Sequence, residues 1–296
     1  MGSAPSKEEA HCPEWDELEN SVTAASQCQS INGFEFTSVT SLKNSSKMMH
    51  IVSLRNRLYP LQYMAISHEP EIPGYYNFVV MGSLSDMPYK INAATNGQVG
   101  AQMTVPIIKN TNMTIASSIG QGFNVLTSII NATPKYNIKL DVNCLNYFSN
   151  SNLDLGFVHN GSIGKCGLHV QVPLRKETPS FSLGITREVN KIQYGFLGDY
   201  KDTFVAILGV QYKHSEKTIV GASMYLIPST LSSSFQFGAQ RGFMRSIVSA
   251  SVSTTGTVTT LFQRNVSDKM SLLISGNFNQ ATRSYGIGLG VQLMTD

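Results

Sequence analysis

The chain has 296 residues, with 22 Lys and Arg against 19 Asp and Glu, which leaves a net charge of +3. Only 14% of the residues are charged, well below the roughly 25% of typical soluble domains. This small and scattered basic excess excludes a basic stripe for nucleic acid, and 14 Phe and 12 Tyr exclude a disordered chain. No apolar run reaches the roughly 18 residues of a membrane-spanning helix.

The first predicted element is one amphipathic helix over 13–29, after a small, polar and flexible leader at 1–12. Trp15, Leu18 and Val22 recur at helical spacing, behind a proline that the first helical turn tolerates. Acidic residues in the first turn suit the positive end of the helix dipole. The apolar stripe is too weak to span a bilayer, so we expect the helix to lie inside or along the wall of the remaining structure.

The chain after Gly33 alternates between apolar and polar residues, which is the period of β-strands. The clearest strand has an apolar face that consists of Tyr136, Ile138, Leu140 and Val142. Its polar face consists of Lys135, Asn137, Lys139, Asp141 and Asn143. A final strand at 284–293 repeats the pattern, whereas 84–98 fits neither one strand nor two.

The spacing predicts the architecture. The stretch from 34 to 296 holds 296 − 33 = 263 residues, and strands of about 10 residues with turns of about 4 give roughly 19 strands. The polar faces carry mostly Ser, Thr, Asn, Gln and Gly, which suits a watery interior behind an apolar outer band. We therefore predict an all-β transmembrane barrel over 30–296, whose lumen is lined by the five polar residues 135, 137, 139, 141 and 143. A soluble all-β binding protein is the alternative from another class.

The sequence contains no enzyme motif. We find no GxSxG elbow, phosphate loop, HExxH or CxxC, and the six histidines and four cysteines lack metal-ligand spacing. We therefore predict no enzyme activity and no catalytic, cofactor or metal site.

The last strand resembles the sorting signal of mitochondrial barrel precursors, a polar residue followed by glycine and spaced apolar residues. Ser284-Tyr285-Gly286-Ile287-Gly288-Leu289-Gly290-Val291 fits this form, and the signal residues are Ser284, Gly286, Leu289 and Val291. With the preceding helix and strands, the chain resembles the eukaryotic porin superfamily. Such a strand offers an assembly machine one apolar edge for strand addition.

Within that superfamily, the chain is most similar to the channel subunit of the translocase of the outer mitochondrial membrane. The segments that carry this likeness are Ile31–Phe36, Met48–Leu54, Tyr212–His214, Ser234–Gly238 and Leu272–Asn279. Two departures are the short leader and the region 84–98. The resemblance implies a channel for unfolded precursor proteins in the outer membrane of a mitochondrion or related organelle, without a cofactor.

The resemblance also implies partners and a lumen charge. The expected partners are presequence-bearing precursors, single-helix translocase subunits, membrane lipid and a second copy of the chain, but no nucleic acid. Acidic lumen patches for basic targeting peptides are expected at Asp141, Asp154, Asp199 and Asp202. The alternative within the same fold is a metabolite and ion porin of the voltage-dependent anion-channel type.

Overall fold

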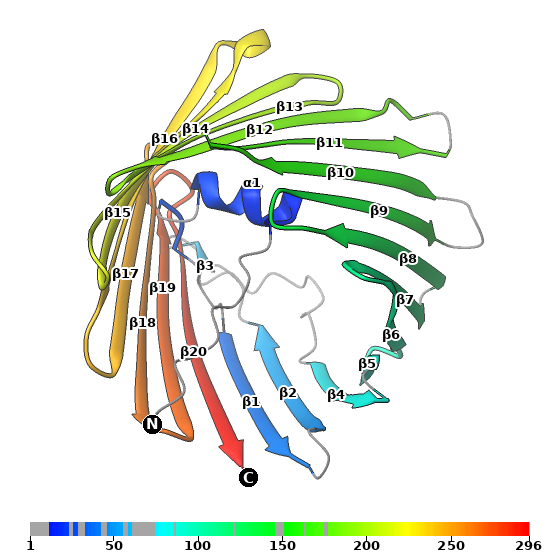
Figure 1. The fold of residues 1–296 in the computed structure, drawn as a ribbon. Helices are drawn as coiled ribbons and strands as arrows, with labels where there is room; N and C mark the ends of the chain where they lie inside the picture. The colour runs from blue at the N-terminus through cyan, green and yellow to red at the C-terminus, as the bar shows by residue number, and fades with distance from the viewer. Residues whose placement is uncertain are drawn as a thin grey trace, which may run out of the picture.

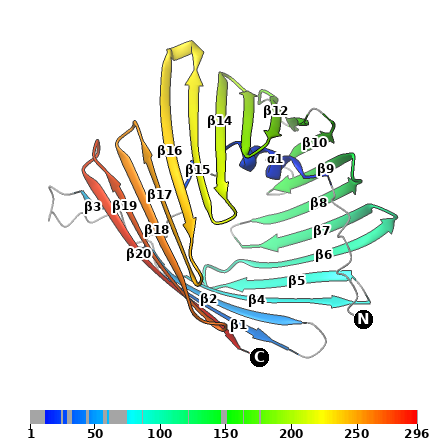
Figure 2. The same ribbon diagram turned by 60° about the vertical axis from the view of Figure 1, so that its left-hand side comes forward.

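The computed structural model describes residues 12–23, 26–28, 33–42, 46–55, 59–60, 75–85, 87–120, 122–145, 151–162, 164–174 and 177–295. These residues form one β-barrel with a short helix inside it, as Figures 1 and 2 show from two sides.

The elements follow one another as a series of hairpins. The helix is α1 (Trp15–Thr23), and a 3-10 turn, η1 (Pro228–Thr230), joins β15 to β16. The first strands are β1 (Gly33–Ser41), β2 (Lys47–Arg55), β3 (Tyr59–Pro60), β4 (Tyr75–Leu84), β5 (Met87–Ala94), β6 (Val99–Ile108) and β7 (Thr111–Ile119). The middle strands are β8 (Phe123–Ala132), β9 (Tyr136–Leu145), β10 (Asn152–Asn160), β11 (Lys165–Pro173), β12 (Ser180–Val189), β13 (Ile192–Tyr200) and β14 (Phe204–Ser215). The last strands are β15 (Thr218–Ile227), β16 (Ser232–Gly242), β17 (Ser246–Ser253), β18 (Thr257–Ser267), β19 (Met270–Asn279) and β20 (Ser284–Thr295).

The barrel closes through its first and last strands. Each ring strand pairs antiparallel with its neighbour along the chain, whereas β1 pairs parallel with β20. The two-residue β3 lies outside the ring, because β2 pairs directly with β4 and β3 pairs only with the start of β20. Nineteen of the twenty strands therefore form the closed ring, which confirms the predicted fold and strand number.

The two faces of the ring differ in chemistry as the alternation predicts. Side chains directly opposite each other on paired strands share a face, and Phe157 lies between Ile138 and Leu168 on the outer one. These outer residues are 40–45% exposed, although they are large and apolar. On the inner face Gly156 lies between Lys139 and His169. No helix in the described part of the chain is long and apolar enough to cross a membrane.

The helix is shorter than the sequence predicts. It runs from Trp15 to Thr23, whereas Ser26, Gln27 and Cys28, within the predicted 13–29, are not helical. The side chains of these three residues instead form hydrogen bonds with inner side chains of the wall. Ser and Thr have low helix propensity, and polar side chains with partners elsewhere compete with a helical backbone. Residues 1–11 of the predicted leader lie outside the described residues, whereas Cys12 is held against the wall.

The ambiguous region 84–98 contains the end of one strand and the whole of another. Leu84 is the last residue of β4, β5 occupies Met87–Ala94, and a turn leads into β6. The strand is short, and its second residue is Pro88, opposite Ser83. Because proline cannot donate to the ladder and eight residues give few alternations, the sequence pattern there is weak.

Candidate functional site

The N-terminal residues 12–23 and 26–28 form an inner segment that lies along one side of the barrel lumen. At its start the backbone N–H of Cys12 donates to the carbonyl oxygen of Thr133 (3.0 Å), and Asn137 Nδ2 donates to the carbonyl oxygen of Cys12 (3.2 Å). Helix α1 then contacts strands β10 to β15, as Figure 1 shows. The segment therefore occupies one wall of the lumen rather than its axis.

The far end of the inner segment is tied to later strands by side-chain hydrogen bonds. The hydroxyls of Ser26 and Ser223 lie 2.7 Å apart, and Cys28 Sγ lies 3.2 Å from the hydroxyl of Ser249 on β17. The inner segment therefore extends along the wall from β9, where Asn137 binds Cys12, to β17, where Ser249 contacts Cys28. The lumen beside β1–β8 is not contacted by α1.

An apolar stripe fixes the helix to the wall. Trp15, Leu18 and Val22 are each at most 6% exposed, and they pack towards wall residues that include Val158 and Leu197. Burying an aliphatic side chain of this size contributes about 1.5–3 kcal/mol. The helix is thus held mainly by packing, which explains why its apolar stripe is not available to a bilayer.

Four inward glycines bring the helix close to the sheet, and we call them the glycine floor: Gly167, Gly184, Gly195 and Gly209. A Cβ added at Gly167 or Gly184 would lie 2.8 or 2.9 Å from Leu18 Cδ2, closer than real Cβ atoms approach. A Cβ at Gly195 would lie 2.8 Å from Val22 Cγ2, and one at Gly209 would collide with the carbonyl oxygen of Val22. The absence of side chains at these positions is therefore what allows the helix to lie against the wall.

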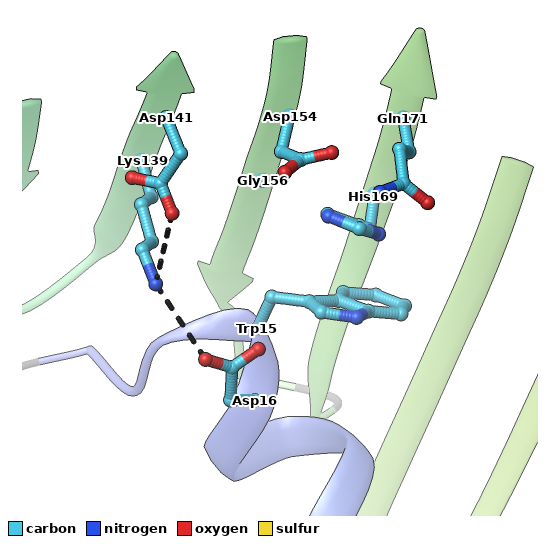
Figure 3. Close-up of a pocket in the computed structure, with 8 residues that line it drawn as sticks. All are labelled: Trp15, Asp16, Lys139, Asp141, Asp154, Gly156, His169 and Gln171. Atoms are coloured by element: carbon cyan, nitrogen blue, oxygen red, sulfur yellow. Dashed lines mark ion pairs between the residues drawn. The ribbon is translucent and has the colours of Figure 1, made fainter. Parts of the chain in front are cut away.

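A charged recess opens beside the first turn of the helix, with a volume of about 220 Å³. Figure 3 shows Lys139 between Asp141 of its own strand and Asp16 of the helix, while Trp15 covers His169. Lys139 Nζ lies 3.4 Å from Asp141, 3.5 Å from Asp16 and 3.5 Å from Glu14. The Trp15 and His169 rings stack with centroids 5.6 Å apart and an interplanar angle of 14°.

Acidic groups outnumber basic ones in this recess. Asp141 lies directly opposite Asp154, which in turn lies opposite Gln171, so two carboxylates stand side by side on the inner face. One buried oxygen of each, Oδ1 of Asp141 and Oδ1 of Asp154, has no hydrogen-bond partner. Lys139 is the one cation among the lining residues and is shared by three carboxylates. The recess therefore favours a positively charged guest.

Burial also shifts the pKa values of two side chains on the inner segment. It raises the pKa of Glu19, and the nearby carboxylate of Asp16 raises it further. It raises the pKa of the Cys12 thiol as well, and this thiol donates a hydrogen bond to the carbonyl oxygen of Val158 at 3.5 Å. In the described part of the chain, no group of three or more His, Cys, Asp or Glu side chains could hold a metal ion.

The predicted lumen residues occupy different places on and beside β9. Lys135 lies in the turn that precedes the strand, and Asn137 binds the start of the inner segment. Lys139 and Asp141 line the recess, whereas Asn143 lies one step further along the inner face, opposite Asn152.

The other predicted acidic residues are not gathered at the recess, except for Asp154. Asp199 accepts a hydrogen bond from Ser182 (2.8 Å) on the neighbouring strand. Asp202 accepts one from Thr178 (2.7 Å) between two turns at the barrel rim.

The predicted sorting residues lie on β20, which pairs with both β19 and β1. Leu289 and Val291 lie on the outer face, opposite Phe34 and Phe36 of β1. Gly286 lies on the inner face opposite Asn277 of β19, and the hydroxyl of Ser284 contacts that of Thr282 at 2.7 Å.

The wall from β17 to β19 is uncharged where it faces inward. Ser249 contacts the inner segment, and the residues that share its side of the sheet are uncharged. They comprise the polar Ser251, Thr259, Gln263, Ser275 and Asn277 and the apolar Ile247, Leu261 and Leu273. An uncharged wall of this kind offers a passing charged solute no ionic partner. The lumen thus combines one acidic recess with a weakly interacting wall.

The sequence analysis does not predict the glycine floor, nor does it predict that His169 lines the recess. The floor has a visible signal, because its glycines occupy inward positions of four consecutive strands. That signal indicates close approach only once the helix is known to lie against those strands.

Comparison with known proteins places this geometry among porins. The model of the eukaryotic porin family matches residues 205–288, which include most of β14 and reach into β20. No curated protein matches the chain. Residues 205–288 are thus similar to the eukaryotic porin family.

Solved structures show the same fold at low sequence identity. A five-substitution mutant of the porin of Rh. blastica is 13% identical, with a TM-score of 0.51 over 73% of this chain and 96% of that chain. A two-substitution mutant of the same porin covers the same shares at 13% identity and a TM-score of 0.50. A structure described as "Asymmetric conductivity of engineered proteins" is 11% identical, with a TM-score of 0.50 over 78% of this chain and 93% of that chain. Over these shares the fold is that of a porin-type barrel.

The glycine floor generates a prediction about the inner segment. Gly184→Val should loosen the helix while leaving the barrel closed, because the added carbons overlap Leu18 and Trp15, and overpacking of this kind costs about 1–3 kcal/mol. Trp15 is the only tryptophan, so its fluorescence quenching by aqueous acrylamide reports the helix alone. We expect quenching to rise in this variant. Gly276→Val, on a strand that α1 does not contact, is the control, and equal quenching in the two variants would contradict the packing described.

Proposed function

We propose that the chain is a protein-conducting channel of the mitochondrial outer membrane, or of a related organelle, and that it passes unfolded precursor proteins through its polar lumen. The observation that supports this most is the acidic recess, where Asp141 and Asp154 each keep a buried oxygen without a partner. Basic targeting segments supply ammonium and guanidinium donors that match such acceptors.

The mechanism requires no covalent chemistry. A basic segment is attracted to the recess by the excess of carboxylates over Lys139, and the extended chain that follows is solvated by the neutral wall of β17–β19. Because each contact is weak and solvated, the chain is held without being trapped. Among the described residues, the inner segment keeps to one wall, and we propose that the moving polypeptide passes on the β1–β8 side of the lumen.

A metabolite and ion porin of the same fold is the second candidate, and the match of residues 205–288 to the eukaryotic porin family supports it equally. The two candidates differ in what the acidic recess does. In a metabolite porin it biases small ions, whereas in a protein channel it also engages basic peptides.

The proposed partners follow from the same function. We propose that single-helix translocase subunits and a second copy of the chain bind the outer wall and that presequences enter the lumen. Affinity isolation of the tagged protein in mild detergent tests this part of the proposal. Isolation of the barrel without small single-helix proteins or a second copy would contradict it.

Peptide block of single-channel current separates the two candidates. A basic amphipathic peptide should interrupt the current through the reconstituted barrel, whereas a peptide with its basic residues replaced by Gln should not. Replacing Asp141 and Asp154 by Asn should weaken the block by roughly fivefold or more, since each nearby charge is worth about 1 kcal/mol in water.

Asp202→Asn is the matched control for the block, because Asp202 bonds Thr178 at the rim rather than lining the recess. Equal block by the basic and neutral peptides would favour the metabolite porin. A protein that gives no current in planar bilayers would favour the soluble alternative.

We also propose that β20 is the sorting signal for assembly. Replacing Leu289 and Val291 together by Gln should leave import intact but prevent insertion, because these outer positions pair with Phe34 and Phe36 and offer the apolar edge. Integration that resists carbonate extraction from organelles is the measurement. Gln292→Asn on the inner face should integrate normally, and normal integration of the double variant would overturn the assignment.

A further inference from the structure

The two rims of the barrel carry different charges. We call the rim at which β20 ends the C-terminal rim. At most of its hairpins a basic residue lies in the turn or directly follows it. These residues are Lys47, Lys109, Lys135, Lys165, Lys191, Lys217, Arg245 and Lys269. The described acidic residues there are Glu188, Glu216 and Asp268. Hairpin turns at the opposite rim have few charges in the described residues, and there Lys201 pairs with Glu177 at 3.7 Å.

Three arginines at the C-terminal rim lie on the outer face of the barrel. Arg187, Arg241 and Arg264 lie within the last few residues of β12, β16 and β18, and all are exposed. Their direct cross-strand partners are the outer residues Tyr194, Val248 and Leu272. The three side chains therefore lie where the apolar band of the barrel ends.

These arginines lack carboxylate partners within the described residues. Each has no Asp or Glu within ion-pair distance, and the guanidinium of Arg241 lies over the ring of Phe243 at 5.4 Å. Basic residues on the inner face of the same rim are placed differently. Lys213 pairs with Glu188 at 3.2 Å, and Lys165 lies opposite the buried Thr186.

We propose that Arg187, Arg241 and Arg264 form a collar that binds the phosphates of anionic lipid headgroups in the leaflet at the C-terminal rim. Guanidinium groups bind phosphate through paired hydrogen bonds, and aromatic residues such as Tyr194 and Phe243 are typical of the membrane interface. The basic turns add a field that attracts the same leaflet. The lateral, lipid-facing register of the arginines favours lipid over an acidic protein approaching from the aqueous side.

The inference requires that the barrel lies in a bilayer, as the proposed function does, but it is independent of what passes through the lumen. The test uses the full chain reconstituted in phosphatidylcholine vesicles with a minor share of phosphatidylglycerol. Spin-labelled forms of the two lipids report which one is held at the barrel surface. At low salt we expect phosphatidylglycerol to be favoured by roughly fivefold, since a basic side chain near an anionic surface gives about that factor, and we expect high salt to reduce the preference.

The matched variants separate the outward collar from net charge. Replacing the three arginines by Gln should remove most of the preference, whereas Lys165→Gln with Lys213→Gln, at the same rim but facing inward, should lower it much less. Each single arginine variant should lower it in part, which keeps the test decisive if the triple variant does not fold. An equal fall in the lysine variant would overturn the assignment to the collar.

Two results with the unchanged protein would also overturn the inference. If the protein inserts but shows no lipid preference, the collar is overturned and the proposed channel is unaffected. An acidic protein partner would then be the better explanation of the basic rim. Failure of the protein to insert in any vesicle would overturn both the collar and the proposed channel.

Discussion

The parallel pairing of β1 with β20 is the constraint on which the rest of the structure depends. In a bilayer, every backbone N–H and C=O must find a partner within the protein, so an open sheet edge is not tolerated. With nineteen ring strands the first and last strands run in the same direction, and their register sets both faces at once. The outer face holds the pairs Phe34–Leu289 and Phe36–Val291, whereas the inner face holds the pair Glu35–Gly290. A shift of one residue would reverse these faces.

Closure creates a lumen, and the inner segment then makes its two sides unequal. The glycine floor lets Trp15, Leu18 and Val22 pack against one side. There Glu14, which directly precedes the helix, and Asp16 in its first turn add to the carboxylates of the wall. The other side stays free of α1. An acidic recess and an uncharged wall thus lie on different parts of the lumen, and this arrangement supports the proposed channel for charged, weakly held chains.

The sequence predicts the strands well because their period is local. Each strand must place apolar residues outside and polar residues inside, so alternation alone indicates the barrel and roughly nineteen strands. The resemblance of the last strand, with its alternating glycines after Ser284, points to the porin family, whose model matches residues 205–288. The weak pattern at 84–98 reflects a short strand with a proline as its second residue rather than a break in the ring.

The helix and the recess are harder to predict because they depend on contacts between distant segments. Ser26 leaves the helix to bond Ser223, a partner 197 residues away, and no local pattern indicates this. The ion pair between Lys139 and Asp16 likewise depends on which strands the helix packs against. Lys139 and Asp141 can be recognised as polar-face residues, but their meeting with the helix follows from the glycine floor, whose meaning appears only in three dimensions.

A disulfide across the closing pair tests the central claim most directly. In a protein whose four native cysteines are replaced by Ser, Thr37→Cys with Gln292→Cys should oxidise readily within the reconstituted barrel, since these residues are direct neighbours on the inner face. Thr37→Cys with Val291→Cys should not, because the two thiols then point to opposite faces. The result that would contradict the account is cross-linking of the second pair in preference to the first, or of neither.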